Sequence, residues 1–181
     1  MSVATTPLAG RRIALLVAPM FRDEEVFEPL EVLRARGATV TVLGLDGSPA
    51  PGKLGGVVEP DGRIVDARPD DFDAVILPGG QAPERLRLDA ATLAFVHEFA
   101  RRGRLIAAIC HGPQVLISAD LLRGRRATCY EGIRDDVKLA GAHYEDAPVV
   151  VDGNLITSRK PEDLPSFHDA ITAALAAAPR P

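Results

Sequence analysis

The segment Leu105-Ile-Ala-Ala-Ile-Cys-His-Gly-Pro113 carries the strongest structural signal in the chain. Its apolar start, Leu105 to Ile109, is typical of a strand that is buried on both faces of a parallel sheet. Cys110 follows that strand directly, and Gly112 and Pro113 indicate that the chain turns at once into a helix. The segment therefore predicts a strand-to-helix turn inside an α/β sheet, with a thiol at the turn.

The same alternation of apolar strand and amphipathic helix extends in both directions from this segment. We expect strands at 13–18, 38–45, 74–77, 105–109, 149–151 and 155–157, and helices at 26–36, 93–103, 111–119, 135–140 and 164–175. The β-α-β opening implies a right-handed crossover and a parallel sheet. The Gly- and Pro-rich stretch 46–61 is expected to be a loop, with a short hairpin around Val57-Val58 and Ile64-Val65. The sequence therefore predicts a three-layer α/β/α sandwich with a mostly parallel sheet.

The size and composition indicate one globular domain with an aliphatic core. The chain has 181 residues, of which 46% are hydrophobic and 25% charged, whereas aromatics make up only 4% and Trp is absent. We expect a flexible leader at 1–12, one domain at 13–175 and a frayed tail at 176–181.

Several classes of function are disfavoured by charge and residue spacing. The net charge of −4 argues against nucleic-acid binding, which favours a basic surface. The two cysteines and four histidines lack metal-ligand spacing, so neither a metal nor a cofactor is expected. No membrane-length apolar run and no apolar signal-peptide segment near the start are found, which makes the cytoplasm the expected location and a membrane partner unexpected.

Ligands of open parallel sheets bind beyond the carboxyl ends of the strands, where the loops 19–25, 78–84 and 110–113 are expected to meet. A lone Cys beside an apolar run is usually an inert buried thiol. The position of Cys110 favours another interpretation, because a helix that begins after it would lower the thiol pKa, as in the nucleophile elbow of serine hydrolases.

The backbone N–H of His111 would then be an oxyanion donor, and that of Gly80 in the Gly79-Gly80 turn a second one. Each of these residues also has a plainer interpretation. The side chain of His111 tends to diverge from that of its neighbour, so His111 could contribute only its backbone at a helix start. The two glycines could form an ordinary turn.

Several motifs together resemble the ThiJ/PfpI family, which includes PfpI-type intracellular proteases and the Parkinson-associated deglycase. They are Ala108-Ile-Cys-His-Gly-Pro113, Leu77-Pro-Gly-Gly-Gln-Ala-Pro-Glu-Arg85, Leu122-Arg-Gly-Arg125, Tyr130-Glu-Gly-Ile-Arg-Asp-Asp136 and the stretch from Val149 to Leu164. The resemblance covers roughly 13–175. It implies a flavodoxin-like sandwich related to class I glutamine amidotransferases.

The resemblance also implies roles for individual residues. Cys110 would be the nucleophile with His111 beside it, and Gly80 and His111 would supply the oxyanion donors. Glu84 would pair with the histidine across the interface of a homo-oligomer, either a dimer or a hexamer. Tyr130 matches a tyrosine that lies near the pocket.

One segment departs from the family pattern. The PfpI branch has Phe-Glu-Asp-x-x-Glu or Phe-Glu-Asp-x-Glu after the first strand, where this chain has Phe21-Arg-Asp-Glu-Glu25. Glu25 takes the place of the carboxylate that contacts the cysteine. Arg22 replaces an acid, which would alter the charge preference for substrates. An acid cluster favoured by the helix dipole is the alternative explanation for Glu24, Glu25 and Glu28.

The main hypothesis is a cofactor-free cysteine enzyme that acts on small carbonyls or their protein or peptide adducts. The candidate activities are glyoxalase III, deglycase and intracellular peptidase. The alternative is a redox-responsive stress protein or chaperone that uses oxidation of Cys110. A glutamine amidotransferase is disfavoured, because it needs a late His-x-Glu and His168 is followed by Asp169-Ala170.

Overall fold

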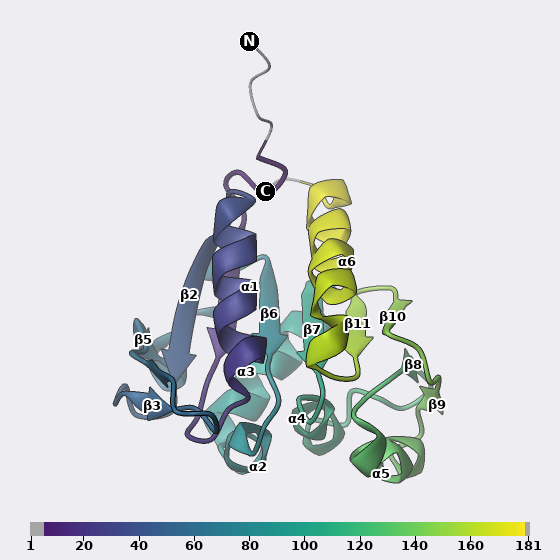
Figure 1. Ribbon diagram of the computed structural model, residues 1–181. Helices are drawn as coiled ribbons and strands as arrows, with labels where there is room; N and C mark the ends of the chain where they lie inside the picture. Colours follow the sequence, from purple (N-terminus) through teal and green to yellow (C-terminus); the bar gives the residue numbers. More distant parts are fainter. Residues whose placement is uncertain (1–5, 180–181) are drawn as a thin grey trace.

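A seven-stranded sheet runs through the middle of the computed structural model, which describes residues 6–179 (Figure 1). The strand order is β10-β11-β7-β6-β1-β2-β5, and every neighbouring pair is parallel except β10 with β11. These strands are β1 (Arg12–Leu16), β2 (Thr39–Gly44), β5 (Gly62–Arg63), β6 (Ala74–Leu77), β7 (Leu105–Ile109), β10 (Val149–Asp152) and β11 (Leu155–Ser158). The mostly parallel sheet predicted from the sequence is thus confirmed.

Helices cover both faces of this sheet and complete the three layers. The long helices α1 (Asp23–Ala35) and α6 (Leu164–Ala177) pack together on one face, and α3 (Ala90–Arg101) covers the other (Figure 1). The short helices α2 (Ala82–Leu86), α4 (Pro113–Ser118) and α5 (Arg134–Leu139) lie around the lower ends of the strands. The remaining pieces are the small strands β3 (Ala50–Pro51), β4 (Val57–Val58), β8 (Arg126–Ala127) and β9 (His143–Tyr144), and single 3-10 turns at Ile64–Asp66, Pro69–Asp71, Glu131–Ile133 and Pro161–Asp163.

The central strands are buried on both faces, which explains their continuous apolar runs. Each residue of β6 and β7 is buried, and Ile76 and Leu77 are fully inaccessible. Burying an aliphatic side chain of this size contributes about 1.5–3 kcal/mol. The strand that leads to Cys110 is therefore held rigidly between its neighbours.

Two local elements differ from the sequence-based expectation. Helix α1 begins at Asp23 rather than Val26, because three acidic residues occupy a first turn whose N–H groups favour negative charge. The expected pairing of Val57-Val58 with Ile64-Val65 is wrong. Val57–Val58 pairs with Ala50–Pro51 instead, and Ile64 turns into the core at 2% exposure.

The expected leader 1–12 and tail 176–181 lie partly outside the described residues. Among those that are described, Leu8 is fully buried in the core and Arg12 already opens β1. At the other end α6 continues to Ala177. Arg11 donates hydrogen bonds to the carbonyls of Ala178 and Pro179, which ties the start of the fold to its end.

The outer edge of β2 is covered mainly by side chains rather than by a full strand. Its neighbour β5 pairs only with Leu43 and Gly44. Both backbone groups of Val42 bond to Asp61. The Asp61 carboxylate accepts from the Val42 N–H at 2.8 Å, and the Asp61 N–H donates to the Val42 carbonyl at 2.8 Å. Arg34 donates to the carbonyl of Val40 at 2.8 Å.

Candidate active site

The chain turns sharply where β7 ends, and Cys110 occupies the turn. Its φ is +61°, in the left-handed region that a side chain adopts at an energetic cost. Hydrogen bonds hold its backbone on two sides, from the Cys110 N–H to Ser158 at 3.0 Å and from the Tyr130 N–H to the Cys110 carbonyl at 2.9 Å. A Cβ on Gly112 would collide with the carbonyl of Leu77, so only glycine allows the chain to enter α4 here. The expected strand-to-helix turn is present.

The Gly79-Gly80 turn presses directly against the cysteine. A Cβ on Gly79 would lie 2.7 Å from the Cys110 Cβ, and one on Gly80 would lie 2.5 Å from the N atom of Arg22. The backbone N–H groups of Gly80 and His111 face the sulfur and lower the pKa of the thiol by favouring its ionised form. The two expected oxyanion donors are therefore close to the sulfur.

Glu25 is the acidic residue of α1 that reaches the cysteine. It is fully buried, its Oε2 accepts from the Gly79 N–H at 2.6 Å, and the same face of Gly79 contacts Cys110. Glu25 Oε1 has no hydrogen-bond partner among the described residues. Burial raises the pKa of Glu25 to about 7, which makes a protonated carboxyl available beside the sulfur near neutral pH.

Burial and, after it, the Glu25 charge together raise the pKa of the Cys110 thiol to about 12, against the effect of the two N–H groups. The low thiol pKa expected from a helix N-terminus is thus wrong for the resting site. Helix α4 has only 6 residues, and loss of solvation outweighs its donors. Protonation of Glu25 removes its opposing charge and supplies a hydrogen-bond donor to the sulfur.

His111 lies against the thiol despite being its neighbour in sequence. Its Nδ1 is 3.2 Å from the Cys110 Sγ, and its ring stacks on Tyr130 with centroids 4.9 Å apart. Burial lowers the pKa of His111, the Glu84 charge raises it, and the Lys53 charge lowers it. A mainly neutral imidazole suits a proton acceptor.

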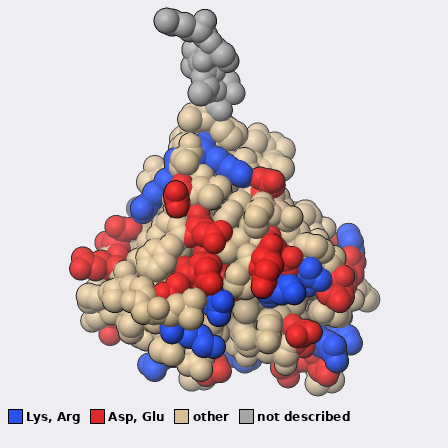
Figure 2. Space-filling view, in the orientation of Figure 1, with Lys and Arg blue, Asp and Glu red and all other residues tan. Residues whose placement is uncertain are grey.

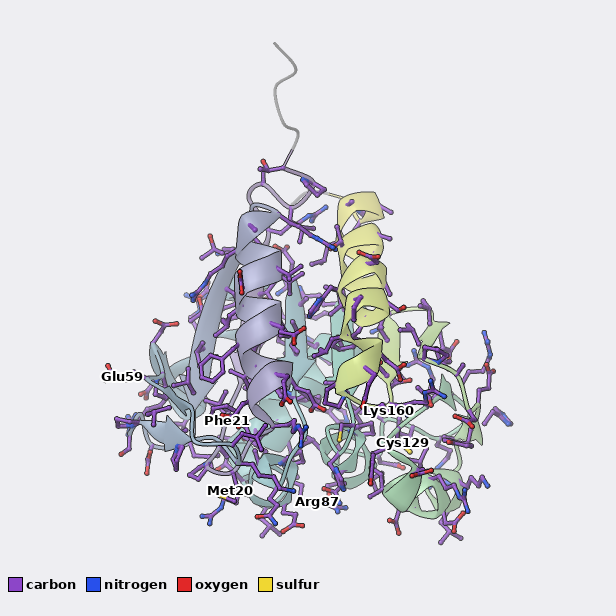
Figure 3. All side chains as sticks on the ribbon, viewed as in Figure 1. Met20, Phe21, Glu59, Arg87, Cys129 and Lys160 are labelled. Carbon is purple, nitrogen blue, oxygen red and sulfur yellow. The ribbon has the colours of Figure 1, made fainter. Side chains whose placement is uncertain are left out.

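These groups open onto a cavity of about 490 Å³ at the carboxyl edge of the sheet. Its lining contains every side chain that the sequence proposed: Arg22, Glu25, Glu84, Cys110, His111 and Tyr130. Met20 and Phe21 approach this edge from the α1 side, and Lys160 from the α6 side (Figure 3). Glu84 lines the cavity from α2 of the same chain, and no hydrogen bond to His111 is found among the described residues.

Sequence reasoning missed several residues of the lining, namely Lys53, Gln81, Lys160, Pro161 and Glu162. They lie in loops or, for Pro161 and Glu162, in a single 3-10 turn, which carry no periodic pattern, and only the folded arrangement brings them to the cavity. A second hollow of about 500 Å³ opens beside the other ends of the strands, near Arg11 and Asp73. No cysteine or histidine is among the described residues that line it.

Three further observations concern the described part of the chain beyond this site. Within residues 6–179, no helix combines the length and apolar character that a membrane crossing requires. The same part of the chain contains no cluster of three or more His, Cys, Asp or Glu side chains suited to a metal ion. Acidic and basic side chains are interspersed over the face drawn in Figure 2.

The fold and the turn at Cys110 define a class: flavodoxin-like α/β proteins that present one thiol at the carboxyl edge of the sheet. Within that class, residues 11–174 match the model of the DJ-1/PfpI family, and the chain belongs to that family. The resemblance seen in the sequence motifs is confirmed.

Relatives and solved structures agree with this assignment. A deglycase from Pyrococcus abyssi is 45% identical over 84% of this chain and 92% of its own length. Protein/nucleic acid deglycase 2 of Escherichia coli is 43% identical over 88% of this chain and 94% of its own. A two-domain protein from Anabaena variabilis, with DJ-1/ThiJ/PfpI-like and ferritin-like domains, has a TM-score of 0.90 and 43% identity, covering 94% of this chain and 50% of that one. The chain thus belongs with enzymes of the DJ-1/PfpI family.

Proposed function

We propose that this protein is a cofactor-free cysteine enzyme that acts on small carbonyls or on the adducts that they form with proteins. The observation that carries the proposal is the turn at Cys110, where two backbone N–H groups, a buried carboxyl and an imidazole surround one sulfur. The names of the deglycase relatives favour adducts as substrates.

The first chemical step is addition of the thiol across the carbonyl. A bond forms between the Cys110 sulfur and the carbonyl carbon, and the π electron pair moves to the oxygen. The N–H groups of Gly80 and His111 stabilise the developing negative charge on that oxygen. The thiol proton passes to Glu25 or His111, which can return it to the oxygen or to a departing amine. The product of addition is a hemithioacetal.

Oligomerisation forms part of the proposal. Glu84 is exposed on α2, and its charge already acts on His111 from within the same chain. We propose that Glu84 of a neighbouring subunit in a dimer or hexamer fixes the histidine tautomer. A carboxylate in this role can change the rate by orders of magnitude.

Turnover of methylglyoxal and of its N-acetyllysine and N-acetylcysteine adducts tests the proposal. An amine-free buffer removes the carbonyl scavenging that imitates deglycation. We expect the Cys110→Ser variant to lose about a thousandfold or more of the rate, and Cys129→Ser to stay within about twofold. Equal rates for the wild type and Cys110→Ser would exclude Cys110 as the nucleophile. Peptide hydrolysis by the same variants tests the peptidase activity.

Redox sensing is the second candidate, favoured by the position of Glu25. A carboxyl with a pKa raised to about 7 by burial can donate a hydrogen bond to an oxidised sulfur. A sensor needs only Cys110 and Glu25, whereas turnover also needs the histidine. A His111→Ala variant whose Cys110 oxidises as in the wild type, and which still protects cells from oxidants although it turns over no carbonyl substrate, would favour sensing.

A further inference from the structure

The cavity beside Cys110 is lined by three cationic side chains that are not equivalent. Arg22 donates to both oxygens of Glu24, at 2.8 and 3.1 Å, so its charge is largely offset. Lys53 and Lys160 make no ion pair within residues 6–179. The sequence pointed to Arg22 as the residue that alters charge preference, but the structure leaves the two lysines as the cations available to a ligand.

Lys53 stands on a loop that is fixed to the start of α1. The Lys53 N–H donates to the Phe21 carbonyl at 2.8 Å. The next turn wraps around the buried carboxylate of Asp23, which accepts from the N–H groups of Leu54 at 2.8 Å and Gly56 at 2.7 Å. A Cβ on Gly52 would lie only 2.5 Å from that carboxylate, so the loop closely fits its anchor. The backbone that carries the ammonium group is therefore preorganised.

Lys160 lies in a different electrostatic setting. It approaches the cavity from the α6 side, and Glu162, two residues further along, lines the same cavity (Figure 3). The nearest sequence neighbours of Lys53 are the uncharged Gly52 and Leu54. Its anchor Asp23 has both carboxylate oxygens occupied by backbone donors. The other carboxyl groups of the lining are Glu25, which is fully buried beside Cys110, and Glu84, whose charge acts on His111.

Together these observations identify a polar subsite next to the reactive thiol. We propose that Lys53 selects carbonyl substrates that carry an anionic group, such as a carboxylate, close to the carbonyl carbon. This inference rests on the proposed function for the identity of the substrate, but the charge preference belongs to the site itself. The influence of the Lys53 charge on His111 supports the closeness of the ammonium group to the reacting atoms.

Alkylation of Cys110 by a pair of reagents tests the charge preference without any need for turnover. Iodoacetate carries a carboxylate where iodoacetamide carries an uncharged carboxamide. We expect Lys53→Met to lower the ratio of the iodoacetate rate to the iodoacetamide rate by about threefold to tenfold, and Lys53→Arg to restore it. Lys138→Met removes an equal charge outside the cavity, where Lys138 lies 3.7 Å from Asp135, and should change the ratio by less than about twofold. Raising the salt concentration should weaken the wild-type preference.

Turnover links the preference to catalysis. Glyoxylate carries a carboxylate beside its aldehyde, whereas methylglyoxal is neutral. Lys53→Met should raise the KM for glyoxylate by about threefold to tenfold and leave that for methylglyoxal within about twofold. An unchanged alkylation ratio in Lys53→Met, or an equal fall in Lys138→Met, would overturn the inference. Failure of the wild type to turn over either carbonyl would overturn the proposed function and leave the alkylation result standing.

Discussion

Cys110 and Cys129 are both buried, at 7% and 0% exposure, and burial raises the pKa of each to about 12. Their surroundings differ. Cys110 has two backbone N–H groups, the carboxyl of Glu25 and the imidazole of His111 around its sulfur. The charges that act on Cys129 are those of Asp136 and Lys138. Burial therefore gives no reason to expect the two thiols to differ in reactivity, whereas the prearranged donors and the nearby proton acceptor at Cys110 do.

Among the groups around Cys110, we expect the largest effect on turnover from Glu84, for which Cys129 has no counterpart. If Glu84 acts in trans, Glu84→Gln should lower turnover by about a hundredfold. Mixing the inactive variants Cys110→Ser and Glu84→Gln and allowing subunit exchange should restore part of the activity, because some sites regain both intact residues. Exchange is followed by native mass spectrometry. Full activity of Glu84→Gln alone, or no recovery despite exchange, would remove Glu84 from the mechanism.

Direct labelling sharpens the comparison of the two thiols. With limiting iodoacetamide at pH 7.5, we expect Cys110 to react at least about tenfold faster than Cys129, since Glu25 can take the thiol proton within the site. Peptide mapping by mass spectrometry gives the ratio, and the unfolded chain provides the control in which both thiols should react alike. Preferential labelling of Cys129 would break the comparison.

Oxidation tests the contribution of Glu25. We expect mild peroxide to stop at a sulfinic acid on Cys110, because the protonated carboxyl donates a hydrogen bond to the oxidised sulfur. Glu25→Leu should shift the end point, whereas Glu24→Gln, at the half-buried partner of Arg22, should not. Intact-mass spectra report the end point. An identical profile for Glu25→Leu would assign the stabilisation elsewhere.

The smallest effect concerns a buried titratable group that does not line the cavity. His168 is 3% exposed, its Nε2 has no partner among the described residues, and burial lowers its pKa to about 4. The unfolded chain takes up a proton near pH 6.5, whereas the folded chain resists it, so stability falls as pH falls from about 6.5 to about 4. Urea unfolding at pH 7 and pH 4.5 gives the difference in the free energy of unfolding between the two pH values. We expect His168→Gln to reduce that difference by about 1–3 kcal/mol. An unchanged difference would contradict the prediction.

The sequence predicted the parts of the fold that depend on continuous apolar runs. The strands at 74–77 and 105–109 agree with β6 and β7 to the residue, because each is buried on both faces and bounded by turn residues. It did not predict β3, β8 and β9, which have only 2 residues each. Pairs this short are fixed by tertiary contacts rather than by local preference.

The site was predictable to the same extent. The turn identified Cys110 and His111, and the family pattern selected Glu25 among three neighbouring acids. The thiol pKa was not predictable, because desolvation depends on how completely the folded chain surrounds the sulfur. Lys53 was missed for a related reason: its position depends on the contact between Asp23 and a loop more than twenty residues away in sequence.

Asp61 and Arg34 have a consequence for the behaviour of the protein in concentrated solution. An open strand edge is a template on which another chain can add a strand, which leads to aggregation. On β2 the outward carbonyl of Val40 and both backbone groups of Val42 are already occupied by these two side chains and by the Asp61 N–H. The part of the β2 edge that the two-residue β5 leaves uncovered thus offers few free donors or acceptors to a foreign strand. The molecule is protected from misassembly without another full strand.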